Sequence, residues 1–174
     1  MKKEDGFPGQ ISFVIPERIL ALVKDNPLIS NLYITDIGYY PQAKHHFRER
    51  PAGSTELILI YCIEGKGEIL LKDSTYLVSA DHFFIIPSGM PHSYRSDLSQ
   101  PWSIYWIHFS GLNSGIFGKF ACQSIPIERG KSSRISDRLE LFSETFRNLE
   151  RGFSLETLNT SICVCRTCWL PLLI

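Results

Sequence analysis

Short apolar runs separated by turn residues fill the middle of the chain. The run 56–63 is rich in β-branched and aromatic residues and is apolar on both faces after its first position, which is typical of a strand buried between two layers. The runs recur roughly every ten residues with Gly, Pro, Asp or Ser at each joint, which indicates a barrel or sandwich and not a βαβ fold. The pattern predicts strands at 32–37, 56–63, 68–71, 75–78, 83–86, 92–96 and 104–109.

Helical spacing appears on both sides of these strands. A short helix is predicted to open at Pro16 and to stop at Asn26. Near the C-terminus, two apolar seams separated by Gly152 predict two helices, and the short link between them predicts an antiparallel hairpin. The seams comprise Ile135, Leu139, Phe142, Phe146 and Leu149 on the first helix and Leu155, Leu158, Ile162, Cys165 and Trp169 on the second.

The two patterns divide the chain into a mainly β part and a helical part. We expect residues 1–130 to form a β-barrel with an N-terminal arm, and residues 131–174 to form a helical hairpin for dimerisation or linkage. The 174 residues are 44% hydrophobic and 21% charged, which predicts a packed core with little room for a second full domain. No helix-turn-helix pattern follows Trp169, so this chain is not expected to read DNA by itself.

Charge, cysteines and termini narrow the class of protein further. Lys plus Arg and Asp plus Glu are both 18, and a balanced charge argues against nucleic-acid binding by this segment alone. The start of the sequence shows no secretory signal, and charges and prolines interrupt every apolar run before it reaches membrane-spanning length. The five cysteines have no framework spacing, so we expect a reduced, cytoplasmic protein.

Four motifs carry a family resemblance. They are Arg50-Pro51 before the first long strand, the segment 79–87, the proline-glycine turn 87–94, and the segment 102–111. In this order and spacing the chain resembles the effector-binding part of AraC-family transcription regulators, a cupin-type barrel also described as a double-stranded β-helix or jelly roll. The resemblance implies a ligand-sensing and dimerising domain that contacts DNA only through a domain missing from this chain.

The resemblance also implies where a small-molecule effector binds. In sugar-responsive relatives an arginine, a tyrosine and a tryptophan line the pocket, and Arg50, Tyr94 and Trp106 match them. An indole covers the apolar face of a sugar while guanidinium and phenol bond its hydroxyls, so a carbohydrate is the expected class. His92 is a fourth candidate. The alternatives are core filling for Trp106, a surface charge for Arg50 and a local hydrogen bond for His92. Ile104 departs from relatives that carry histidine there, which leaves the particular sugar open.

The family's helical hairpin commonly mediates dimerisation. The apolar face of Leu139, Phe142 and Phe146 is therefore the candidate surface for a homodimer. The alternative is that the same residues dock on the barrel.

A metal-dependent cupin enzyme, such as a sugar isomerase or dioxygenase, is the second hypothesis. His45, His46, Glu56 and His92 suggest it, but adjacent residues of a strand point to opposite sides, so only one of the first two can join His92. We therefore expect no metal, no cofactor and no catalytic residue. Cys163, Cys165 and Cys168 are interpreted as helix residues without an assigned role. A cupin that serves only as an assembly scaffold is the third hypothesis.

Overall fold

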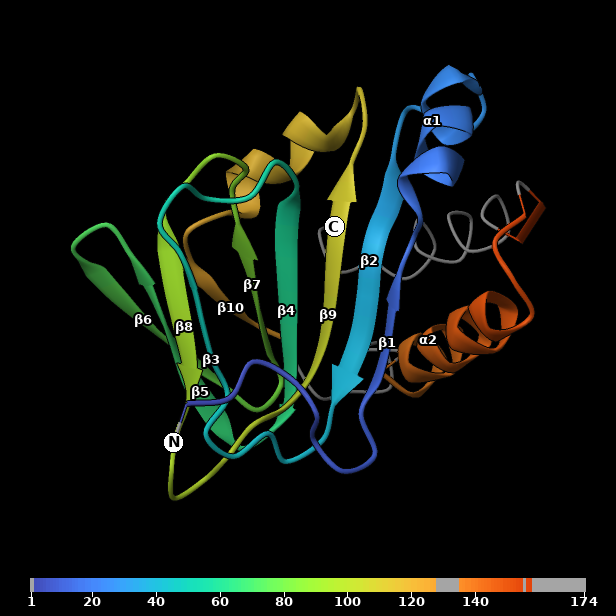
Figure 1. Ribbon diagram of the computed structural model, residues 1–174. Helices are drawn as coiled ribbons and strands as arrows, with labels where there is room; N and C mark the ends of the chain where they lie inside the picture. Colours follow the sequence, from blue (N-terminus) through green and yellow to red (C-terminus); the bar gives the residue numbers. More distant parts are fainter. Residues whose placement is uncertain (1, 128–134, 155, 158–174) are drawn as a thin grey trace.

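The computed structural model describes residues 2–127, 135–154 and 156–157 (Figure 1). The chain forms two antiparallel sheets with helices on the outside of the larger one. In chain order the elements are β1 (Ile11–Val14), α1 (Glu17–Asp25), β2 (Tyr33–Tyr40), β3 (Phe47–Arg50), β4 (Leu57–Glu64), β5 (Lys66–Leu71), β6 (Ser74–Ser79), β7 (His82–Ile86), β8 (His92–Ser96), β9 (Ser103–Ser110), the 3₁₀ helix η1 (Ser114–Phe120), β10 (Ser124–Pro126) and α2 (Ile135–Glu150).

The large sheet has the order β1-β2-β9-β4-β7-β10, and the small sheet has the order β3-β8-β5-β6. The two sheets lie face to face as the walls of a barrel, and α2 lies on the opposite side of the large sheet (Figure 1). The mainly β barrel followed by a C-terminal helix is therefore confirmed. All seven predicted strands are present, with bounds that differ by a few residues.

The central strands of the large sheet are buried on both faces. Side chains of one face, among them Ile58 and Ile60, pack between the sheets, whereas the alternate positions Leu59 and Tyr61 pack under the helices. A strand covered on both sides needs apolar residues at successive positions, which explains the continuous apolar run of β4.

Helix α2 packs on the barrel through the predicted seam. Phe142 and Phe146 are 3% and 5% exposed, and the Phe142 ring lies 4.3 Å from the ring of Tyr105 on β9. The prediction that these residues and Leu139 form a dimer surface needs correction, because the barrel of the same chain covers the two phenylalanines and packs against Leu139. The docking alternative describes the structure.

The predicted second helix, with Leu155, Leu158, Ile162, Cys165 and Trp169, lies outside the described residues. So do Cys163 and Cys168. None of the described helices has both the length and the apolar character needed to cross a lipid bilayer.

Candidate ligand-binding site

A cavity of about 180 Å³ opens between the two sheets. Residues of β2, β3, β4, β8 and β9 form its walls, and the N-terminal arm and β1 border it. A site of this size suits a small metabolite better than a drug-sized ligand. The lining residues are Glu4, Asp5, Ser12, Val14, Asp36, Tyr40, His46, Arg48, Arg50, Ile60, Tyr94, Ile104, Trp106 and His108.

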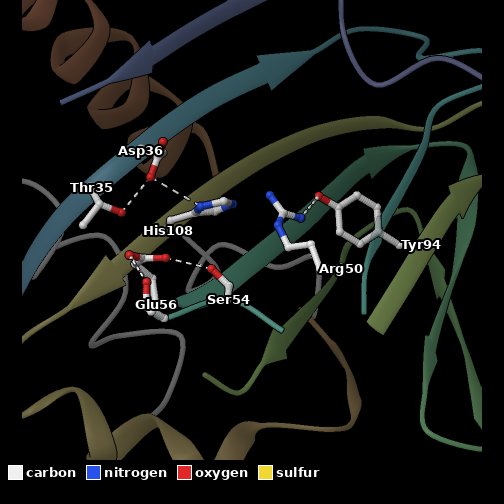
Figure 2. A network of polar contacts seen from close by, with 8 residues as sticks. Thr35, Asp36, Arg50, Ser54, Glu56, Tyr94 and His108 are labelled. Atoms are coloured by element: carbon white, nitrogen blue, oxygen red, sulfur yellow. Dashed lines mark hydrogen bonds and ion pairs between the residues drawn. The ribbon is translucent and has the colours of Figure 1, made fainter. Parts of the chain in front are cut away.

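Arg50 and Tyr94 meet at one wall of the cavity, as the resemblance implies. Arg50 ends the edge strand β3, and Tyr94 lies on the neighbouring strand β8. The Arg50 guanidinium Nη1 donates to the Tyr94 hydroxyl over 3.0 Å (Figure 2). Both side chains are at least half-buried, so the alternative of a free surface charge does not describe Arg50.

Asp36 and His108 face Arg50 from the large sheet (Figure 2). They are direct cross-strand partners on β2 and β9, with Asp36 Oδ2 3.4 Å from His108 Nδ1 and 2.7 Å from the Thr35 hydroxyl. Burial by itself raises the pKa of Asp36, but the hydrogen bond and charge of His108 and the bond from Thr35 outweigh it and hold that pKa below its usual value. Asp36 therefore stays an anionic acceptor at neutral pH.

Trp106 forms part of the floor of the cavity. It lies opposite Gly38 on the neighbouring strand, where the absent side chain leaves room for the indole ring. The ring stands edge-on to Tyr40 with centroids 5.4 Å apart. Its Nε1–H is buried and has no acceptor among the described residues, so the accessible part of the indole in the cavity is its ring and not this donor.

His92 lies beside Arg50 in the strand register but outside the cavity lining. Its Nδ1 is 2.7 Å from the carbonyl oxygen of Met90, so Nδ1 must carry the proton. The predicted local hydrogen bond is thus present, and the buried Nε2 is left as an acceptor without a donor among the described residues. Burial lowers the pKa of His92 despite the bond to Met90, and the charge of Arg50 adds to this.

The two adjacent histidines differ in burial, as predicted, but both precede β3, and His45 lies in a turn with a left-handed backbone. His46 is buried and its Nδ1 accepts from Trp102 Nε1 over 3.1 Å, while His45 is exposed. Burial, with the charges of Arg48 and Arg50, lowers the pKa of His46 to about 3, so its ring is neutral. Within the part of the chain that the structure describes, no three His, Cys, Asp or Glu residues converge as a metal site would require.

The N-terminal arm borders the cavity at its rim. Lys3 pairs with His46 through a parallel bridge, with backbone bonds to His45 and Phe47. Glu4 then forms an ion pair with Arg48 of β3. The arm thus lies along β3, next to the Arg50 side of the cavity.

Sequence reasoning found Arg50, Tyr94 and Trp106 but did not assign Asp36, Tyr40, Arg48 or a pocket role for His108. For Asp36, Tyr40 and His108 the signal is alternation: Asp36, Gly38 and Tyr40 pair with His108, Trp106 and Ile104, so one face of β2 and β9 supplies these three residues. Their positions two apart were visible in the sequence, but the register that joins the strands was not. Arg48 comes from the edge strand β3.

The comparisons with known proteins agree with this geometry. The family model described as AraC-like ligand binding domain matches residues 37–158. The MmsAB operon regulatory protein of Pseudomonas aeruginosa is 36% identical over 101 residues, which cover 56% of this chain and 33% of that protein. The Msm operon regulatory protein of Streptococcus mutans is 30% identical over 89 residues, 47% of this chain and 30% of that protein. The chain therefore spans about a third of the length of these relatives.

Solved structures that resemble this chain include a cupin domain and a cupin barrel protein. The Cnp3 cupin domain of Schizosaccharomyces pombe has a TM-score of 0.41 and 16% identity, over 64% of this chain and 71% of that one. A cupin 2 conserved barrel domain protein from Leptotrichia buccalis has a TM-score of 0.36 and 18% identity, over 65% and 44%.

Proposed function

The chain belongs to the AraC-like ligand binding domain family, and on this premise we propose that it is the effector-sensing part of a transcription regulator. A small molecule would enter the cavity between the sheets, and a DNA-binding domain outside this chain would respond. The relatives are named as operon regulatory proteins, which supports the proposal. The observation that carries it is the cavity itself, where Arg50, Tyr94 and Trp106 converge.

The fold offers a route from ligand to helix. Along β9, Trp106 and His108 line the cavity, whereas Tyr105, the residue before Trp106, packs on Phe142 of α2. A ligand that contacts β9 from the cavity and shifts this strand therefore also shifts the surface on which α2 packs. Binding would in this way bias the position of whatever follows α2, including a DNA-binding domain.

Homodimerisation through segment 131–174 is part of the proposal, in a cytoplasmic regulator. Because Phe142 and Phe146 are buried on the barrel, the contact must use other residues of that segment. Sedimentation velocity of the 174-residue chain over a range of concentrations tests this. A monomer at every concentration would remove dimerisation from the proposed function of this chain.

Titration calorimetry and tryptophan fluorescence against a panel of sugars and sugar derivatives test effector binding. At least one compound should bind and change the emission of Trp106, and Trp106→Phe should lose that response. Arg95→Gln is the matched control, because Arg95 is exposed and pairs with Glu68 away from the cavity. Absence of any response across the panel would favour the scaffold hypothesis.

The metal-dependent enzyme is tested separately by elemental analysis of the purified protein. We expect no stoichiometric metal. A metal retained through purification and lost in His92→Ala would replace the sensor hypothesis with the enzyme.

A further inference from the structure

We infer that the effector is a small hydroxylated carboxylate, such as a hydroxy acid or a sugar acid, and not a neutral sugar. This rests on the proposed function, because it names the chemical class that the same cavity would recognise. The argument comes from the charges around the cavity and from which of them already have partners.

The acidic side chains near the cavity are largely satisfied within the chain. Glu4 pairs with Arg48, and Asp36 accepts from Thr35 and lies beside His108. Glu56, next to this network in Figure 2, accepts from the hydroxyls of Ser54 and Thr55. Asp5 also borders the cavity, but it is exposed on the arm, where solvent and salt screen its charge.

Of the two arginines that line the cavity, Arg48 pairs with Glu4, whereas Arg50 forms no ion pair among the described residues. Its guanidinium donates to the Tyr94 hydroxyl, and its charge acts on the Asp36 carboxylate without direct contact. A guanidinium has five N–H donors in a planar fork, and a carboxylate matches two of them at once. The half-buried position of Arg50 on the cavity wall reduces the screening of its charge by water. The geometry therefore favours a ligand that brings a negative charge to this wall.

The wall formed by the large sheet favours a ligand with hydroxyl groups. Asp36 is an anionic acceptor that lines the cavity, and its carboxylate is partly accessible. A hydroxyl group can donate to this carboxylate, which a second carboxylate cannot do, and unlike an ammonium group it adds no positive charge beside Arg50. The indole ring and Ile60 and Ile104 give the short carbon skeleton an apolar surface to lie on. One ligand with a carboxylate and hydroxyls would thus satisfy both walls.

Titration calorimetry of the 174-residue chain with matched pairs of compounds tests whether the cavity prefers an acid to a neutral compound. The pairs are glucuronate with glucose, galacturonate with galactose, and glycerate with glycerol, whose members differ in the carboxylate. In at least one pair the acid should bind at least tenfold more tightly, and its Kd should rise with added KCl. Arg50→Gln should abolish the difference within that pair and Arg50→Lys should retain part of it, because a lysine keeps the charge but loses the fork.

Arg95→Gln is again the control and should leave the preference unchanged, while thermal melting verifies that each variant folds. The comparison of acid with neutral partner on the unmodified chain decides the question even if an Arg50 variant does not fold. Neutral members that bind as tightly as the acids would overturn the inference and leave the proposed function standing. If no member of either class binds, the inference is overturned, and the wider panel of sugars and sugar derivatives decides the effector-binding proposal by itself.

Discussion

Replacing Gly38 with alanine tests whether the floor of the cavity is as tightly packed as the strand register indicates. A Cβ at this position would lie 2.5 Å from Trp106 Cζ2 and 2.8 Å from the backbone oxygen of Ile11. Ordinary contact begins near 3.4 Å, so the indole must retreat by about 0.9 Å (3.4 minus 2.5). Because the backbone oxygen of Ile11 also lies close to the added Cβ, residue 38 cannot relieve the contact by shifting towards β1. Overpacking of this kind costs about 1–3 kcal/mol of unfolding free energy.

Urea denaturation of Gly38→Ala measures this cost, and a chain of this size should also lose about 2–12 °C in Tm. The matched control is Gly118→Ala in η1, where an added Cβ meets nothing within 4 Å. The control should stay within about 0.5 kcal/mol of the unmodified chain. Equal stabilities for the two variants would refute the close contact between Gly38 and Trp106. The displaced ring should also reduce the affinity for any ligand that stacks on it.

Two further predictions concern the packing of α2 on the barrel and the loss of stability at acid pH. Phe142→Ala should lower the unfolding free energy by about 3–5 kcal/mol, because its ring is buried against Tyr105, whereas exposed Leu112→Ala should change it by less than about 0.5 kcal/mol. Similar costs in urea denaturation would contradict the packing of α2. The pKa of His46 is about 3 in the folded chain and about 6.5 in the unfolded chain. Between these two pH values only the unfolded chain binds the proton, so the free energy of unfolding should fall as the pH drops from 6.5 towards 3. The slope due to His46 approaches about 1.4 kcal/mol per pH unit, and His46→Gln, which keeps an acceptor for Trp102, should flatten it. An unchanged pH profile in that variant would show that His46 is not the group responsible.

The sequence was most informative where burial imposes a pattern. The apolar run of β4 and the helical seam of α2 were both predictable, because a doubly covered strand and a helix on a sheet each demand a characteristic spacing. Strand β3, with the sequence FRER, was not predicted. It is a short edge strand with charged residues, and its pairing with β8 defines it, not its own hydrophobicity.

The residues of the site, too, were predictable only where they did not depend on strand pairing. Arg50 and Tyr94 were identified from motifs, yet Asp36 and His108 were not, because their proximity depends on the pairing of β2 with β9. Propensity and alternation say which residues share a face, but they do not say which strands are neighbours. The dimer surface failed for a related reason, since an apolar helix face looks the same whether it docks on another copy or on its own barrel.

The alternation along β9 separates two tasks within one strand. Positions 104, 106 and 108 border the cavity, while positions 105, 107 and 109 belong to the core beneath the helices. Substitutions at the even positions can therefore change which ligand binds while the packing of α2 on the barrel is kept. A combinatorial library limited to 104, 106 and 108 would be a compact starting point for a biosensor with altered selectivity.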